Sequence, residues 1–449
     1  MRASKTGFIV LLMVASASAL LGLAVIQNPG VALPFSIELI LLFGLTLLGL
    51  SREHDGDVRL WLIKLVLATL ALRVVLALFV HFQLSPYFFA PDAIGYERMG
   101  KEISDYWSGT GLAPRAIREG WRPGYIHLNA VFQFVLGESR IALVVLNLFA
   151  GVWTTILTFY LTREFLPVRS AKSAALLTGF FPSLVLWSIL NIRDALATFL
   201  IVTLVLYGVR VSRRFRPSYV LIFAAALLGL GLLRDYMAFL VVAGLAIGTV
   251  AALRPDRIFG TMIFGTVIVM AFTYLADQVG LFSTFRPEDA LETAQMLRTG
   301  LQEGATSAFG LGAQTETIGG ALSYLPLGVA YLLFSPFPWA VNTPLQLTAM
   351  PETLLWYPLF LLALQGLRIS LKGRLTNVLV VLAVLVIVVS SYALVEGNFG
   401  TAYRHRAQIM PLFFVFTGAG LSWTKDRVLA PTKWWRTKTT RVLLRTQPR

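Results

Sequence analysis

Long apolar segments, separated by short connections, constrain this chain more than any single motif does. Runs of about 20 apolar residues recur nearly end to end, and a helix of that length spans a bilayer core of roughly 30 Å. Of the 449 residues, 57% are hydrophobic and 14% are charged, with a mean hydropathy of +0.73. This composition is too apolar for a soluble domain. The sequence therefore predicts an all-α polytopic membrane protein.

The apolar runs predict about twelve transmembrane helices. We expect them near residues 7–26, 33–50, 60–82, 141–161, 173–190, 195–209, 219–233, 237–253, 258–276, 354–367, 378–395 and 407–423. Two shorter segments, 125–136 and 322–334, are further candidates. Several ranges are short for a bilayer, so we expect helix tilt or local thinning of the membrane.

Basic residues indicate the orientation, because Lys and Arg accumulate in the cytoplasmic loops of membrane proteins. In every second connection they cluster, as at 52–59, 163–172, 210–216, 254–257 and 368–374. Both termini are therefore expected in the cytoplasm of a bacterial cell, at its inner membrane. The net charge of +15 is then mainly a topology signal, with contacts to anionic lipid headgroups expected from the C-terminal residues. Nucleic acid is not expected as a partner.

The domain organisation predicted from these patterns is simple. Residues 1–424 form one integral-membrane domain with outer loops at 83–124 and 277–321, and residues 425–449 form a basic cytoplasmic tail. Small residues at 15–19 also resemble a signal-peptide cleavage site, but the apolar run continues to Ile26 and favours an uncleaved first helix. The chain has no cysteine, which excludes disulfides and thiolate catalysis.

Several polar segments fall on the predicted outer face. They are the loop 85–123, the stretches 191–194 and 234–236, the segment 277–321, for which a mobile lid is one use, and the stretch 396–406. Polar and ionisable groups that converge on one rim of a bundle are typical of an active site.

Asp92 is the candidate catalytic residue of the first outer loop. Pro91 prevents the preceding helix from continuing, and residues 93–106 have a helix-compatible composition. In such a helix Tyr96 lies on the same face as Asp92. An acid at the mouth of a bundle can act as a general base, although a helix N-cap is the simpler role for Asp92.

The order of several motifs resembles the GT-C membrane glycosyltransferases, especially family 39 and the RgtA/B/C/D-like group. The motifs are the acid and tyrosine at Asp92 and Tyr96, the stretch from Gly120 to Tyr125 with Arg122, the junction 137–139, and the stretch 181–195 with Arg193. The resemblance covers the first half of the chain more clearly than the second. It implies a GT-C-like bundle of about twelve helices with large outer loops.

The same resemblance implies the chemistry. Such enzymes transfer a sugar from a polyprenyl-phosphate carrier to a lipid, glycan or protein acceptor at the outer face, in the synthesis of envelope polysaccharide or glycolipid. The loop acid, here Asp92, is the catalytic base. Family 39 members often carry two adjacent acids, whereas Ala93 follows Asp92 here, and Glu97 or Asp105 would have to supply the second. No cofactor is expected with certainty, and a divalent metal is doubtful.

Phosphate binding requires cations, and arginine suits it because its planar donors bind in a bidentate manner. Arg404, His405 and Arg406 lie at the outer start of the last predicted span. We expect Asp92 to work with Arg404 or Arg406 across a membrane groove, while interfacial anchoring is the other explanation for these residues. The remaining candidates for substrate or phosphate binding are Arg193, Tyr96 and Arg122.

Two Arg-Asp dipeptides and one arginine inside a span give further expectations. For Arg193-Asp194 and Arg234-Asp235, local ion pairs or helix caps are the simpler interpretation. Arg73 lies in the middle of a predicted span, where a charge is costly, so it requires a buried partner.

Two other functions remain open from the sequence. An O-antigen polymerase or ligase that joins lipid-linked oligosaccharides would rely on outer Arg and His residues more than on Asp92. A transporter or flippase for lipid-linked sugars would place ionisable groups at mid-membrane and use broken helices in related halves.

Overall fold

The computed structural model describes residues 29–114, 124–137, 142–252, 290–303, 305–373 and 375–443. These residues form sixteen helices and one isolated antiparallel β-bridge, between Ala308 and Asn398. The prediction of an all-α protein is confirmed for this part of the chain.

The first half of the chain contains α2 (Pro29–Leu50), α3 (Gly56–Gln83), α4 (Pro86–Phe89), α5 (Asp92–Trp107), α7 (Tyr125–Leu136), α8 (Ala142–Arg163), α9 (Val168–Phe180), α10 (Pro182–Ser188) and α11 (Asp194–Arg213). The second half contains α12 (Pro217–Leu233), α13 (Asp235–Ala252), α15 (Ala290–Gln302), α16 (Ile318–Phe334), α17 (Pro344–Gly373), α18 (Leu375–Val395) and α19 (Phe399–Leu443).

Seven helices within the described ranges are long and apolar enough to cross a membrane, and three shorter apolar helices accompany them. Most of the twelve predicted ranges correspond to helices of this set. The ranges 7–26 and 258–276 lie outside the described residues, as do residues 277–289 of the expected lid at 277–321. The chain is a multi-pass membrane protein.

Two of the differences between the helices and their predicted ranges have clear physical reasons. The range 173–190 is divided into α9 and α10, because Pro182 lacks the N–H that would continue the α9 hydrogen-bond ladder. The last span, predicted at 407–423, is part of the much longer α19. Helix-forming polar residues extend α19 beyond the apolar run in both directions, and an apolar pattern does not reveal them.

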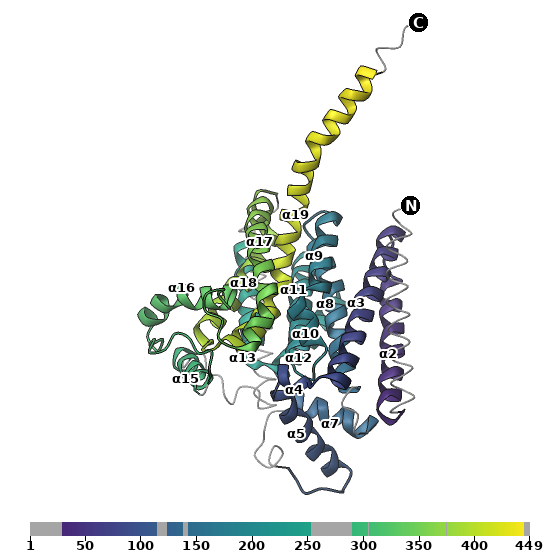
Figure 1. Ribbon diagram of the computed structural model, residues 1–449. Coiled ribbons are helices and arrows are strands. Elements are labelled where there is room, and N and C mark those ends of the chain that lie inside the picture. The colour runs from purple at the N-terminus through teal and green to yellow at the C-terminus, as the bar shows by residue number, and fades with distance from the viewer. Residues whose placement is uncertain are drawn as a thin grey trace.

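The helices form an elongated bundle (Figure 1). Helices α4, α5 and α7 lie at the lower end of the view, and the C-terminal part of α19 projects from the opposite end. Helix α13 packs along α18, and α19 packs against both α17 and α9. Helices α4 and α5 and the C-terminal part of α19 therefore lie at opposite ends of the bundle.

Close packing of α13 on α18 depends on two glycines. A Cβ atom added to Gly244 would lie 2.6 Å from the Cα of Val384, and one added to Gly248 would lie 2.5 Å from the Cα of Val380. Small residues of this kind let membrane helices approach closely, since the bilayer provides no hydrophobic drive for association. This contact holds the start of α13, next to Arg234, close to the C-terminal half of α18.

Candidate active site

Asp92 is the first residue of α5 and lies at the surface. Pro91 occupies the cap position, so the simpler alternative for Asp92, that of an N-cap, is wrong. Its side chain is 52% exposed, and its Oδ2 lies 2.7 Å from Nη1 of Arg404. The predicted meeting of Asp92 with an arginine at the start of the last span is therefore observed, across 312 positions of sequence.

Arg404 joins two carboxylates. Its Nη1 donates to Asp92 and its Nη2 donates to Oδ2 of Asp194, at 2.8 Å. The indole of Trp187 lies beside the guanidinium, with 5.9 Å between its ring centroid and Cζ. Only 15% of the Arg404 side chain is exposed, whereas Asp194 is 1% exposed. One edge of the guanidinium is thus held inside the bundle and the other reaches the surface acid.

Asp194 is a buried anchor at the start of α11. Its Oδ1 accepts hydrogen bonds from Nη2 of Arg234 at 3.0 Å and from Nε2 of Gln408 at 2.6 Å. These two donors occupy one carboxylate oxygen and leave the other for Arg404. A buried carboxylate is stable only when it is paired and hydrogen-bonded, and Asp194 satisfies both conditions.

His405 contacts Arg234, one of the two donors to Oδ1 of Asp194. Its Nε2 lies 2.7 Å from Nη1 of Arg234, and its Nδ1 is hydrogen-bonded to Glu396. Because arginine can only donate, Nε2 of His405 accepts this hydrogen bond. Nδ1 therefore carries the hydrogen and donates to Glu396. The imidazole stacks on Tyr392, with 4.3 Å between ring centroids. His405 therefore orients Arg234 and does not face Asp92.

The two Arg-Asp dipeptides do not form the expected local ion pairs. Arg234 pairs with Asp194, 40 positions away, instead of with Asp235. Arg193 occupies the cap position of α11 and donates from Nη1 to the carbonyl oxygen of Leu233, at 3.2 Å. The chain reversals before α11 and α13 bring the two dipeptides together, which no local spacing reveals.

Arg406 is directed away from Asp92. It is 1% exposed and donates to the carbonyl oxygens of Leu333 and Ser335, at 3.1 and 2.7 Å. Glu352 lies 3.8 Å from it and also accepts from the hydroxyl of Tyr403. Arg406 holds the end of α16 against α17 and α19, so Arg404 is the arginine of this pair that lies next to Asp92.

Tyr96 lies one turn beyond Asp92 and packs edge-on against Tyr125, with 5.0 Å between ring centroids. The neighbouring Glu97 accepts from the hydroxyl of Tyr87 at 2.8 Å and from Nδ2 of Asn191 at 3.4 Å. Asn191 belongs to the turn that leads into α11. Glu97 therefore ties α5 to the segment that carries Asp194.

Glu97 and Asp105, the two candidates on α5 for a second carboxylate, do not contact the Asp92–Arg404 pair. Glu97 faces Asn191, and Asp105 forms an exposed pair with Lys101 at 3.5 Å. The second carboxylate of the site comes from Asp194, on a different segment. Arg122, the remaining candidate, lies outside the described residues. In the part of the chain that the structure describes, no three His, Asp or Glu side chains form a group that could hold a metal ion.

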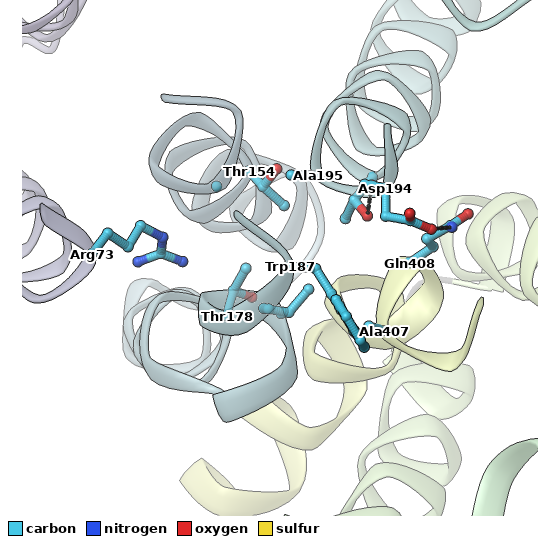
Figure 2. Close-up of a pocket in the computed structure, with 11 residues that line it drawn as sticks. Arg73, Thr154, Thr178, Trp187, Asp194, Ala195, Ala407 and Gln408 are labelled. Atoms are coloured by element: carbon cyan, nitrogen blue, oxygen red, sulfur yellow. Dashed lines mark hydrogen bonds between the residues drawn. The ribbon is translucent and has the colours of Figure 1, made fainter. Parts of the chain in front are cut away.

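A small cavity lies beneath the site (Figure 2). Its volume is about 10 Å³, room for about one water molecule, and its lining includes Arg73, Thr154, Thr178, Trp187, Asp194 and Gln408. Arg73 points into it from α3 and has buried partners, as expected: Ser188 Oγ at 3.0 Å and the carbonyl oxygens of Thr69 and Gly179. Substrates cannot enter a space of this size.

The site contains residues that the sequence reasoning did not assign. Asp194, Arg234 and Glu396 lie in segments that the sequence predicts to be polar and outer-facing. The sequence therefore indicated where these residues lie, but not which residues they contact. Gln408 lies within the apolar run of the last span. A polar amide in such a run is the signal that could have identified it.

The chain is similar to one family model and to a solved structure. Residues 123–278, about a third of the chain, match the family model described as dolichyl-phosphate-mannose-protein mannosyltransferase. No curated protein matches the chain. Among solved structures, the chain is similar to the archaeal oligosaccharyltransferase AglB from Archaeoglobus fulgidus, solved with an inhibitory peptide and a dolichol-phosphate.

That similarity has 15% sequence identity and a TM-score of 0.43, and covers 83% of this chain. The chain spans about half of the AglB chain that it matches. The matched region includes α7 to α13 and with them Asp194 and Arg234. This region of the chain is therefore similar to the family model described as dolichyl-phosphate-mannose-protein mannosyltransferase.

Proposed function

We propose that the protein transfers a sugar from a polyprenyl-phosphate donor to a hydroxyl group of a lipid, glycan or protein acceptor. The reaction takes place at the outer face of the bacterial cytoplasmic membrane and serves the assembly of envelope polysaccharide or glycolipid. The family match names a lipid-phosphate sugar donor, and an enzyme for such a donor must meet it at the membrane surface.

The observation that carries the proposal is the arrangement of Asp92, Arg404 and Asp194. A half-exposed carboxylate lies next to a guanidinium that is anchored from the inside by a second, buried carboxylate. An acid accessible to an acceptor and a cation accessible to a phosphate are the two groups that glycosyl transfer from a lipid phosphate requires.

In the proposed reaction, Asp92 takes the proton from the acceptor hydroxyl as its oxygen attacks the anomeric carbon of the sugar. The bond between that carbon and the phosphate oxygen breaks, and polyprenyl phosphate leaves with the bonding electrons. Arg404 binds the phosphate and stabilises the negative charge that develops on it. Asp194, Arg234 and His405 position Arg404 and touch neither substrate.

The basic residues of the alternate connections support an orientation with both termini in the cytoplasm. In the structure the C-terminal extension of α19 lies at the end of the bundle opposite α5 (Figure 1). With the basic tail inside the cell, Asp92 lies on the outer side. We therefore place donor and acceptor there, and treat residues 425–449 as a basic cytoplasmic tail.

Replacing Asp92 with Asn tests the base. We expect transfer from a polyprenyl-phosphate sugar, measured by mass spectrometry of products in membranes, to fall at least about 100-fold, since general base catalysis contributes about 10²- to 10⁴-fold. Asp105→Asn is the matched control, because Asp105 lies on the same helix and pairs only with an exposed lysine. Undiminished transfer by Asp92→Asn would remove the proposed base and favour a polymerase or ligase.

Deletion of the gene identifies the substrates. Mass spectrometry of lipid-linked glycans in the deletion strain should show accumulation of the donor and loss of one glycosidic linkage, and these identify the sugar and the acceptor. If vesicles that contain the protein import labelled lipid carrier without forming a glycosidic bond, the protein is a transporter and the proposal is wrong.

A further inference from the structure

Arg404 has a fixed edge and an exposed edge. On the fixed edge, Nη2 binds Asp194, which is in turn held by Arg234 and Gln408. On the exposed edge, Nη1 binds Asp92, a side chain that is half exposed and stands at the first position of a surface helix. Loss of the Asp92 contact would therefore leave the guanidinium in place.

The charges around Arg404 favour an anion at the exposed edge. Within the described residues, Arg234 offsets the charge of Asp194, so Asp92 is the remaining partner for the charge of Arg404. Each η-nitrogen of Arg404 carries two N–H groups, and the contacts with Asp92 and Asp194 use one N–H of each nitrogen. A phosphate has several acceptor oxygens and can bind two guanidinium donors at once, whereas the Asp92 contact uses one.

We propose that the phosphate of the donor and the carboxylate of Asp92 compete for the exposed edge of Arg404. The inference rests on the proposed function, because it concerns the same base and the same phosphate site. Before the donor binds, Oδ2 of Asp92 is held by Nη1 of Arg404 and is not free to accept from an acceptor hydroxyl. Donor binding displaces Asp92 from Arg404 and releases it as the base, so the donor activates the enzyme toward the acceptor.

The free energies of the two contacts, Arg404 with Asp92 and Arg404 with phosphate, permit this exchange. Ion pairs with one exposed partner contribute little, because water solvates the free carboxylate well. Bidentate contacts between arginine and phosphate are among the stronger charge-assisted hydrogen bonds. The phosphate therefore replaces Asp92 at small cost, and the binding energy of the donor is reduced by the amount needed to break the pair.

The test measures the equilibrium affinity of the purified full-length protein for polyprenyl phosphate without a sugar, the leaving group of the reaction. Asp92→Asn removes the competing carboxylate, so we expect affinity to rise by up to about fivefold, which corresponds to the upper value of an ion pair with one exposed partner. Asp105→Asn removes an equal charge from the same helix and should leave the affinity unchanged.

A double-mutant cycle separates competition from simple repulsion between Asp92 and the phosphate. We expect Arg404→Gln to weaken binding and to abolish the gain from Asp92→Asn. If Asp92→Asn raises the affinity equally in the wild-type protein and in Arg404→Gln, then Asp92 only repels the phosphate and does not compete with it for Arg404. That result overturns the proposal. If Arg404→Gln does not fold, Arg404→Lys replaces it; lysine keeps the charge opposite Asp194 but lacks the planar fork, so we then expect the gain from Asp92→Asn to be smaller than in the wild-type background.

The outcomes for competition and for general base catalysis are distinguishable. Tighter binding with transfer lost supports both. Unchanged binding with transfer lost refutes the competition and leaves Asp92 as the base. Tighter binding with full transfer refutes the base and with it the proposed mechanism, while the competition at Arg404 stands.

Discussion

Asp92 and Asp194 bind the same guanidinium from opposite sides, so the same substitution at the two positions isolates the effect of burial. Asp92 is 52% exposed and Asp194 is 1% exposed. Asp194→Asn leaves Arg234 and Arg404 facing each other inside the bundle without a negative charge between them. Asp92→Asn leaves Arg404 paired with Asp194.

The expected cost differs accordingly. Removing one partner of a buried pair destabilises by about 3 to 5 kcal/mol. At roughly 2 °C per kcal/mol for a large chain, Asp194→Asn should lower the Tm by about 6 to 10 °C. Asp92→Asn loses a pair with one exposed partner, worth at most about 1 kcal/mol, and should lower the Tm by about 2 °C or less.

Thermal unfolding of the detergent-solubilised protein, followed by tryptophan fluorescence at several heating rates, measures both shifts. Heating rate matters because membrane proteins often unfold irreversibly, and a Tm then depends on the scan. Equal shifts for the two variants would refute the assignment of Asp194 as the buried anchor of Arg404. A larger shift for Asp92→Asn would reverse the order of burial in the site.

Two further predictions concern packing and pH. A Cβ atom at Gly151 would lie 2.8 Å from Nε of Arg73, so Gly151→Ala should destabilise by about 1 to 3 kcal/mol in thermal unfolding, whereas Gly44→Ala, with nothing within 4 Å of the new Cβ, should have no such effect. Burial raises the pKa of Glu53, but hydrogen bonds, foremost from Arg163, bring it below its ordinary value. The contribution of the Glu53 carboxylate to stability is present at neutral pH and is lost as the pH falls through this lowered pKa. The difference in Tm between wild type and Glu53→Gln should therefore close on acidification. A difference that persists at low pH would contradict this.

The helices were predictable from the sequence because a bilayer allows few alternatives. A long apolar run must satisfy its backbone hydrogen bonds internally, and so becomes a helix. The ends were less predictable, because they depend on residues with no apolar signal. Helix α19 continues through a polar stretch, and α9 stops at a proline within an apolar run.

The site was predictable only in part. Asp92 and Arg404 carried a signal, since both are charged residues next to apolar runs and both were expected at the same rim. The partner of Asp194 could not be deduced, because Asp194 and Arg234 each have an oppositely charged neighbour in sequence that offers a simpler explanation. The ion-pair partners depend on how α11, α12 and α13 pack against one another. The sequence of each segment taken alone does not determine that packing.

Three consecutive basic residues at the start of α19 contact three different parts of the protein. Successive residues of an α-helix point about 100° apart. Arg404 meets α5 and α11, His405 meets Arg234 and Glu396, and Arg406 meets the turn after α16. The rotational register of α19 is therefore set by all three at once. A deletion of one residue from α19 directly after Arg406 would rotate the three basic side chains relative to the rest of the helix, and each would meet the wrong neighbour. This helix should therefore tolerate substitution on its lipid-facing side far better than any change in length.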